Sequence, residues 1–243
     1  MSELDERSFL QAYDPSAFDR PSLAVDLAVL TVDDGVLRAL LVQRGEHPFR
    51  GGWALPGGFV QIDESLSAAA RRVLRQKAGL EGVFTEQLYT FGDPGRDPRM
   101  RIVSVAYYAL LDAGQLGEPQ PGRRFLEVVV PWEGETGGPV QPVDRDHQPL
   151  PLAFDHADIL GMAVRRIRGK LDYTPIGFQL LPETFTLREL QRVHETVLGT
   201  SLNKDSFRRR MLASGQLEAT GEREQQVGHR PAELYRFARR SAI

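Results

Sequence analysis

The segment GFVQIDESLSAAARRVLRQKAGL, residues 58–80, decides the fold. Its later part, 65–78, is rich in helix-forming residues and has no internal Gly or Pro, which predicts a helix. Ala69 and Val73 fall on one apolar face, and Gly79 stands where the C-cap of a helix belongs. We therefore expect a glycine-led loop that enters a short amphipathic helix.

Strand patterns on both sides of this segment indicate an α/β fold. Upstream, LAVDLAVLTV from Leu23 and VLRALLV from Val36 flank the turn signal Asp33-Asp34-Gly35, which predicts a β-hairpin. Downstream, MRIVSVAYYALL at 100–111 and FLEVVVPW at 125–132 each predict a buried strand. Residues 1–20 have few periodic apolar positions and predict an arm with at most one short helix.

The composition is that of a globular protein without thiol chemistry. Of 243 residues, 41% are hydrophobic and 26% are charged. Cysteine is absent, which excludes disulfides, zinc–thiolate sites and cysteine nucleophiles. The amino-terminal stretch MSELDERSFLQAYDP does not resemble a signal peptide, and no apolar run approaches the roughly 20 residues of a membrane span. We expect a cytoplasmic protein without a membrane segment.

Charge is distributed unevenly along the chain. Residues 1–150 hold 15 Lys and Arg against 22 Asp and Glu, a net charge of −7. Residues 151–243 hold 15 against 11, a net charge of +4. This asymmetry indicates two modules with different partners, the second suited to a polyanion. A loop rich in Gly, Pro and Asp at 133–151 predicts the edge of the first module.

The pattern after this loop predicts a helix followed by a winged helix. HADILGMAVRRIRGKL at 156–171 is amphipathic. Thr186 and Glu189 form a capping box that opens a second helix. Asn203 is suited to cap a third helix that ends near Gly215, and two strand-like runs separated by a polar loop follow. Such a fold binds DNA in many proteins, and a protein-interaction module is the alternative.

The third helix is the expected recognition helix. Residues near the start of such a helix read base edges, which favours Lys204, Ser206 and Arg208. At about 100° per residue, consecutive arginines cannot all face one way, so a neighbour such as Arg209 contacts phosphate or supports the fold. The wing supplies further side chains for contact with the DNA backbone or minor groove: Arg223, His229 and Arg230. A basic helix that simply faces solvent is the alternative.

The segment 58–80 resembles the Nudix signature G-x5-E-x7-R-E-U-x-E-E-x-G-U, in which U is a bulky aliphatic residue. Six of its nine defined positions match, namely Gly58, Glu64, Arg72, Leu74, Gly79 and Leu80. The resemblance implies an amino-terminal α/β/α sandwich with a mixed sheet. It also implies structural roles for Gly58, Glu64, Arg72 and Gly79, with Glu64 bracing the loop against Arg72.

The three mismatches are the helix glutamates, here Val73, Gln76 and Lys77. In Nudix hydrolases these carboxylates hold divalent cations, because Mg²⁺ prefers anionic oxygen ligands beside a diphosphate. Valine offers no ligand, glutamine offers a neutral one, and lysine repels the ion. The resemblance therefore implies a Nudix domain that is not an enzyme, needs no metal or other cofactor, and binds a nucleotide as a ligand.

Arginines concentrate in YTFGDPGRDPRMR at 89–101, which we interpret as a loop before a strand. Guanidinium groups suit bidentate phosphate binding, and an aromatic ring can stack on a base. The candidate effector residues are Arg44, Lys77, Phe91, Arg96, Arg99 and Arg101. The alternatives are a surface loop with ordinary salt bridges and a solvated Lys77.

Nearly the whole chain is similar to one known family. LAFDHADIL at 152–160, LPETFTLRELQRVHE at 181–195 and GHRPAELYRF at 228–237 resemble the Nudix-related transcriptional regulators of NAD metabolism, the NrtR family. The resemblance implies an effector-binding and dimerisation domain over 1–152, and a linker helix with a winged helix DNA-binding domain over 153–243. It implies a homodimeric repressor that senses ADP-ribose or a related nucleotide. Such a repressor releases palindromic double-stranded DNA operators of NAD biosynthesis or salvage genes.

Three other functions stay open. An active ADP-ribose pyrophosphatase would release AMP from ADP-ribose in the presence of magnesium. A regulator of the same architecture would respond to a sugar such as arabinose instead of a nucleotide. A Nudix-derived scaffold would bind neither an operator nor a nucleotide.

Overall fold

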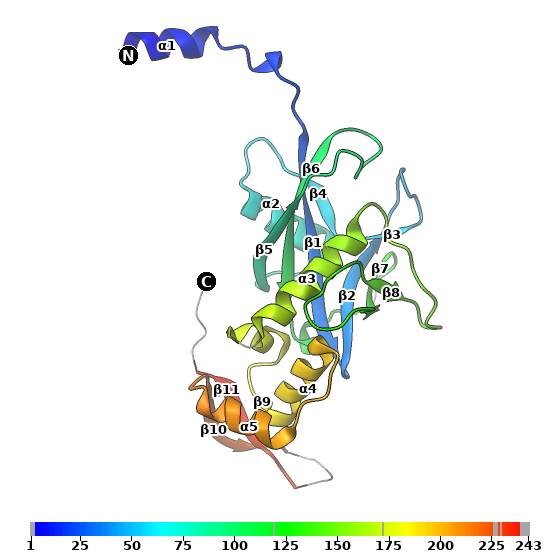
Figure 1. Cartoon of the computed structure of the whole chain (residues 1–243), viewed down its shortest axis with the longest axis vertical. Coiled ribbons are helices and arrows are strands. Elements are labelled where there is room, and N and C mark those ends of the chain that lie inside the picture. The colour runs from blue at the N-terminus through cyan, green and yellow to red at the C-terminus, as the bar shows by residue number, and fades with distance from the viewer. Residues whose placement is uncertain (1–2, 119, 172, 226–227, 229, 239–243) are drawn as a thin grey trace.

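The computed structural model describes residues 3–118, 120–171, 173–225, 228 and 230–238. An arm, a mixed sheet with helices on its faces, and a winged helix follow one another along the long axis (Figure 1). The predicted sandwich with a carboxy-terminal winged helix is confirmed. Among the described residues, no helix has the length and apolar character that crossing a bilayer requires.

The sheet has six principal strands in the order β5-β6-β1-β2-β7-β8. Their bounds are β1 Ser22–Asp33, β2 Val36–Gln43, β5 Phe84–Phe91, β6 Ile102–Leu110, β7 Arg123–Val129 and β8 Gln141–Val143, and the short strands β3 Trp53–Ala54 and β4 Gly57–Phe59 pair with β2 and β1. β1 is parallel to β6 and antiparallel to β2, so the sheet is mixed, as expected. The predicted hairpin is confirmed, and its turn places Asp34 at φ 48° and Gly35 at φ 75°.

Helix α2, Leu66–Val73, packs on one face of the sheet and continues through a π-helical turn over Leu74–Ala78. Gly79 ends it in the left-handed conformation, at φ 68°, as the sequence predicts. Gly58 allows the preceding loop to approach the helix. A Cβ at Gly58 would lie 3.2 Å from Cγ2 of the buried Val73.

Helix α3, His156–Lys170, covers the opposite face (Figure 1). Its buried residues Ile159 and Ile167 belong to the same apolar cluster as Leu30 of β1. That cluster continues into the winged helix through Phe185 and Leu190. One helix therefore helps to form the core of both parts, and the domain boundary after residue 152 stays a prediction.

The winged helix consists of helices α4 Leu187–Leu198 and α5 Lys204–Ala213, with a three-stranded sheet in the order β10-β11-β9. Strands β10 Leu217–Arg223 and β11 Glu233–Phe237 form the expected wing, and β9 Phe185–Thr186 adds a strand that the sequence did not predict. The capping box is present, because the Glu189 amide donates to Thr186 Oγ1 at 3.1 Å. Asn203 caps α5 through the Ser206 amide at 3.0 Å.

In two regions the structure adds detail to the sequence predictions. The predicted loop at 89–101 begins later, because residues 84–91 form β5 at the edge of the sheet. An edge strand with few buried side chains lacks the apolar alternation that identifies a strand. The predicted arm carries the short helix α1, Glu3–Ala12, whose described side chains are all exposed.

Candidate effector and DNA-binding sites

The loop before α2 is held by an ion pair within the Nudix segment. Arg72 donates to both carboxylate oxygens of Glu64, through Nε at 3.0 Å and through Nη2, and Nη2 also donates to the Phe59 carbonyl at 2.8 Å. The hydrogen bonds from Arg72 and from the Gln61 amide lower the pKa of Glu64 to about 2. The expected bracing role of Glu64 is confirmed.

The positions that hold metal in Nudix hydrolases do not form a cation site. Val73 is buried against the sheet, and Gln76 and Lys77 are exposed on the π-helical turn. Across the described part of the chain, no group of three or more His, Cys, Asp or Glu residues could hold a metal ion. The divalent cations that the Nudix fold implies therefore do not fit this set of side chains.

A buried charge network connects β1 with the start of α3. Arg96 donates to Asp155 at 2.8 and 2.6 Å and to Asp26 at 3.2 Å, and the Ser104 hydroxyl donates to Asp26 at 2.6 Å. The guanidinium of Arg96 is 5% exposed. Burial disfavours its charge, but the two carboxylates outweigh this effect and raise the Arg96 pKa. The prediction that Arg96 contacts an effector is not supported, because its guanidinium is already enclosed by carboxylates.

His156 joins this network to the first turn of α3. Its Nδ1 accepts a hydrogen bond from the Leu55 amide at 2.9 Å, so the ring proton lies on Nε2, which faces Asp26 Oδ1 at 3.5 Å. Burial lowers the pKa of His156, and the ring is neutral in this environment. The start of α3 is therefore fixed to this charge network and to β1.

Two arginines and three aromatic rings lie next to this network, and we call them the cationic aromatic cluster: Arg44, Arg99, Phe49, Phe59 and Phe154. The guanidinium carbons of Arg44 and Arg99 lie 4.7 and 5.9 Å from the centroid of the Phe154 ring. Burial, and then the charge of Arg99, lower the pKa of Arg44. Two cations held this close together over an aromatic face favour an anionic ligand with a flat ring.

The backbone of this cluster is strained at two positions. Phe49 has φ 61° and Phe154 has φ 58°, in the left-handed region that phenylalanine rarely adopts. Their rings meet edge to face, with centroids 5.0 Å apart. Strain of this kind concentrates at ligand-binding sites.

Of the predicted effector residues, the structure brings Arg44 and Arg99 together. Arg101 is exposed near the end of its loop, Lys77 is exposed on the turn after α2, and Phe91 packs against the apolar cluster under α3. Phe49, Phe59 and Phe154 were not among the predicted effector residues. The phrase LAFDHADIL contained the signal, since Phe154 stands directly before the two residues that anchor α3.

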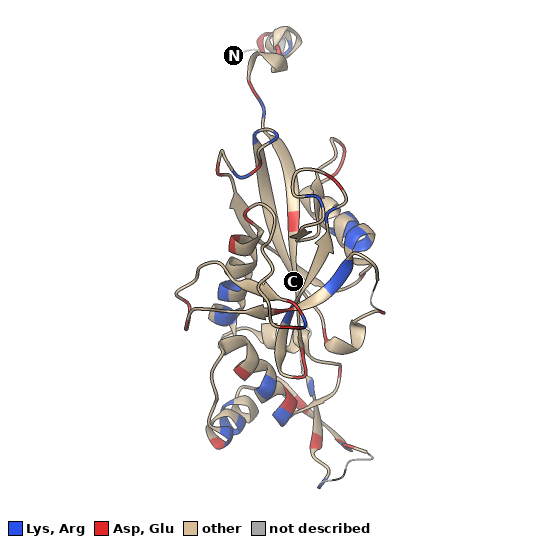
Figure 2. Cartoon of the chain, turned by 90° about the vertical axis from the view of Figure 1, so that its right-hand side faces the viewer, with Lys and Arg blue, Asp and Glu red and all other residues tan. Residues whose placement is uncertain are grey.

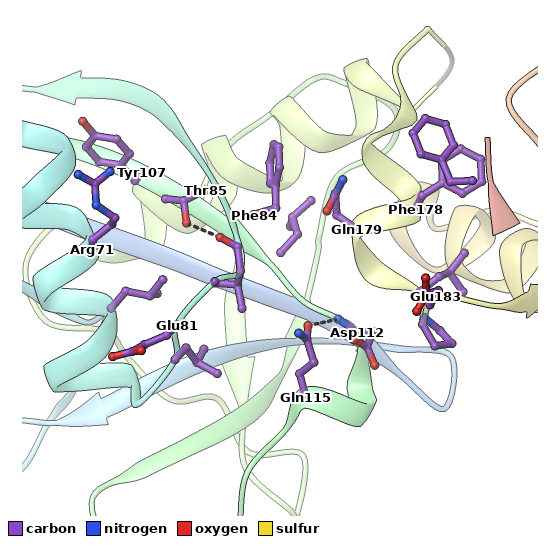
Figure 3. Close-up of a pocket in the computed structure, with 18 of the residues that line it drawn as sticks. Arg71, Glu81, Phe84, Thr85, Tyr107, Asp112, Gln115, Phe178, Gln179 and Glu183 are labelled. Carbon is purple, nitrogen blue, oxygen red and sulfur yellow. Dashed lines mark hydrogen bonds between the residues drawn. The ribbon is translucent and has the colours of Figure 1, made fainter. Parts of the chain in front are cut away.

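A groove of about 1080 Å³ separates the α2 side of the sheet from the winged helix. Arg71 and Glu81 lie on one side of it, and Phe178 and Glu183 lie on the other (Figure 3). None of the predicted effector residues lines this groove. The two parts of the protein are therefore joined mainly on the opposite face, through α3.

Lys and Arg positions are numerous on the helices of the winged helix at one end of the molecule, with Asp and Glu among them (Figure 2). Helix α5 buries Phe207 and Met211, and its exposed residues include Lys204, Ser206, Arg208, Arg209 and Arg210, with Arg223 and Arg230 exposed on the wing. His229, also predicted to contact DNA, lies outside the described residues. A Nudix sandwich that shares a helix with a winged helix defines the class of Nudix-related DNA-binding proteins.

Comparisons with known proteins agree with this class. The NUDIX domain model matches residues 21–145, and the model of the NrtR DNA-binding winged helix domain matches residues 177–237. A protein of Acinetobacter baylyi, named ADPR responsive transcriptional repressor NtrR, is 39% identical over 235 residues, which are 96% of this chain and 88% of that protein. The chain belongs to the NrtR family.

Solved structures of this family share the architecture. Shewanella oneidensis NrtR complexed with a 27mer DNA is 36% identical, with a TM-score of 0.71 over 88% of this chain and 93% of that chain. The NUDIX domain of the same protein, complexed with ADP ribose, is 34% identical, with a TM-score of 0.51 over 69% of this chain and 99% of that chain.

Proposed function

We propose that the chain is a transcriptional repressor that binds operator DNA through α5 and its wing and responds to ADP-ribose in the cationic aromatic cluster. One observation carries the proposal. Arg44 and Arg99 both lie over the ring of Phe154, and Phe154 directly precedes the two residues that fix α3 to the charge network beside β1. The names of the relatives support the same pairing of DNA and ADP-ribose.

The cluster suits the chemistry of ADP-ribose. Guanidinium groups bind diphosphate oxygens through paired N–H donors, and exposed phenylalanine rings stack on adenine. Asp97 holds Arg99 through two hydrogen bonds, from Nε at 3.0 Å and from Nη2 at 2.8 Å, which limits the movement of this arginine. Because this side chain is already ordered, ligand binding loses less side-chain entropy.

Helix α3 is the route from this cluster to the winged helix. At its far end Arg168 donates to the Val197 carbonyl of α4 at 2.7 Å, and to the Trp132 and Gly134 carbonyls at 3.1 and 2.9 Å. A ligand that displaces Phe154 shifts the start of a rigid helix whose end holds α4. ADP-ribose changes DNA affinity to the extent that it binds one orientation of α4 and α5 better than another.

The same set of side chains argues against hydrolysis. With valine, glutamine and lysine at the three cation positions, diphosphate cleavage lacks the metal that would polarise it. We expect no AMP release when the protein is incubated with ADP-ribose and Mg²⁺. Magnesium-dependent AMP release above a blank without protein would overturn this part of the proposal.

The decisive experiment is fluorescence anisotropy on a labelled duplex from the region upstream of the gene that encodes this chain. We expect specific binding that ADP-ribose reverses without added metal. Matched titrations with AMP and with arabinose distinguish nucleotide from sugar effectors. Specific binding that is indifferent to ADP-ribose would refute the effector. Absence of specific binding to this duplex would leave an operator elsewhere in the genome or the scaffold function.

A further inference from the structure

Helix α1 and the residue that follows it, Tyr13, carry an exposed apolar stripe. Phe9, Leu10 and Tyr13 are 63%, 64% and 48% exposed, and the rings of Phe9 and Tyr13 meet with centroids 5.8 Å apart. An isolated ten-residue helix is marginal in water, and most helices depend on packing for their stability. This helix therefore requires a covering surface.

The course of the arm directs α1 away from its own body. Both views show α1 beyond the tip of the sheet (Figures 1 and 2). Pro21 favours an extended conformation at Arg20, and the segment 13–22 contains no glycine that would ease a sharp reversal. The arm then enters β1 directly, so the helix is held away from the sheet that its chain forms.

An exposed apolar patch surrounds the root of the arm, and we call it the root patch: Leu23, Phe59, Ile62 and Met100. The four residues are 39%, 46%, 106% and 52% exposed. Leu23, Phe59 and Met100 are brought together by local contacts: the Ser22 hydroxyl contacts Met100 Sδ at 3.6 Å, Phe59 pairs with Ala24, and the Val60 amide donates to the Leu23 carbonyl at 2.9 Å. Ile62 follows two residues after Val60. The exposed Arg101 follows Met100, and Glu6 stands one turn before Leu10 on α1.

We propose that α1 of one chain docks on the root patch of a second copy, and that the exchange is reciprocal. The stripe and the patch are on one chain, so a two-fold axis buries both at once in a closed dimer. Glu6 and Arg101 give the contact opposite charges at its rim. Phe59 also belongs to the cationic aromatic cluster, with Arg99 5.8 Å from its ring, so the partner's arm covers the rim of that site. This last consequence rests on the proposed function, whereas the exchange does not.

Cross-linking tests the exchange directly, because the chain contains no cysteine. Chains carrying Tyr13→Cys are mixed with differently tagged chains carrying Met100→Cys and treated with a short bis-maleimide. We expect a covalent product that contains both tags. Gln11→Cys, on the opposite face of α1, serves as the control and should give much less of it. A chain that carries both Tyr13→Cys and Met100→Cys is treated in parallel. A cross-link within this chain, without a product between the two tagged chains, would mean that the arm covers its own patch, and no cross-link in either sample would reject docking altogether.

A second measurement tests whether the exposed stripe contributes to the affinity of the dimer. Leu10→Glu is expected to raise the dimer dissociation constant at least about tenfold in sedimentation experiments, while Gln11→Glu leaves it near the wild-type value. Because Leu10 is exposed in the single chain, circular dichroism of the body should not change. Equal dimer affinity in the two variants would overturn the proposal.

Discussion

Arg168 of α3 donates a hydrogen bond of 2.7 Å to the carbonyl of Val197 in the last turn of α4. This side chain is buried and also stacks over Trp132, with its guanidinium carbon 4.6 Å from the ring centroid. Burial lowers its pKa, and the described hydrogen bonds of its guanidinium go to carbonyl groups. A cation at the carboxyl end of α4 also interacts favourably with the helix dipole. Arg168 therefore ties the winged helix to the sheet.

Two substitutions of Arg168 distinguish its contribution to stability from its part in transmitting the ADP-ribose response to the winged helix. A buried carbonyl that loses its donor costs about 1–3 kcal/mol, so we expect Arg168→Met to lower the free energy of unfolding by at least about 2 kcal/mol in urea titrations. Arg165→Met, at an exposed position of the same helix, should change it by less than about 0.5 kcal/mol. For Arg168→Lys, we expect ADP-ribose to bind normally but to change DNA affinity less. A full response to ADP-ribose in that variant would assign Arg168 a structural role alone.

The left-handed backbone at Phe49 should make the Phe49→Gly variant more stable than the Phe49→Ala variant. Glycine accepts φ 61° without the penalty of about 1 kcal/mol that a Cβ adds. We expect Phe49→Gly to unfold with a free energy about 1 kcal/mol higher than Phe49→Ala, and both to bind ADP-ribose about tenfold more weakly by calorimetry. Unchanged ADP-ribose affinity in both variants would remove Phe49 from the binding site.

Arg209 is a better position than Arg208 for testing DNA contacts, because Arg208 also interacts with the wing. Burial raises the pKa of the Tyr235 hydroxyl, Glu233 adds to this rise, and the nearby Arg208 opposes it, so Arg208 also supports the wing. We expect Arg209→Ala to weaken operator binding about tenfold and, for a phosphate contact, to reduce the salt dependence of log K by about 1. Arg71→Ala removes the same charge from an exposed position on α2 and should leave anisotropy titrations unchanged.

Acid should weaken the Glu64–Arg72 pair within a defined pH range. Folding depresses the Glu64 pKa from 4.5 to about 2, so the pair stabilises the fold above pH 4.5 and loses this contribution as the pH falls through about 2. We expect the difference in urea midpoint between wild type and Glu64→Gln to be full at pH 7 and to shrink steadily below pH 4.5. A difference that is equal at pH 7 and pH 3 would contradict the depressed pKa.

Local patterns were sufficient for most of the fold. The hairpin, the box helix with its Gly79 cap and the capping box at Thr186 are short-range signals, and each is present. β5 was partly missed because an edge strand buries few side chains, and β9 because two residues carry no period. Tertiary pairing, which a local pattern does not contain, identifies both.

The candidate site was harder to predict, because its residues meet across long sequence separations. Arg96 looks like a phosphate ligand in its own loop, but Asp26 and Asp155 enclose it from strands and turns far away in sequence. Phe154 looks like a core residue until Arg44 is placed over its ring. The residue types predicted phosphate binding by arginine, whereas the tertiary structure determined which arginines are not already enclosed by carboxylates.

Strand β1 connects the three functional regions of the molecule. It begins at the root patch with Ser22 and Leu23 and carries Asp26 of the buried charge network. Its turn accepts a hydrogen bond at the Gly35 carbonyl from Thr196 of α4, at 3.2 Å. Its twelve residues span about 40 Å at 3.3–3.4 Å each, and pairing with β2 and β6 on either side makes it stiff. In a dimer built through α1, β1 therefore fixes the distance within each chain between the subunit contact and the end of the sheet that contacts α4.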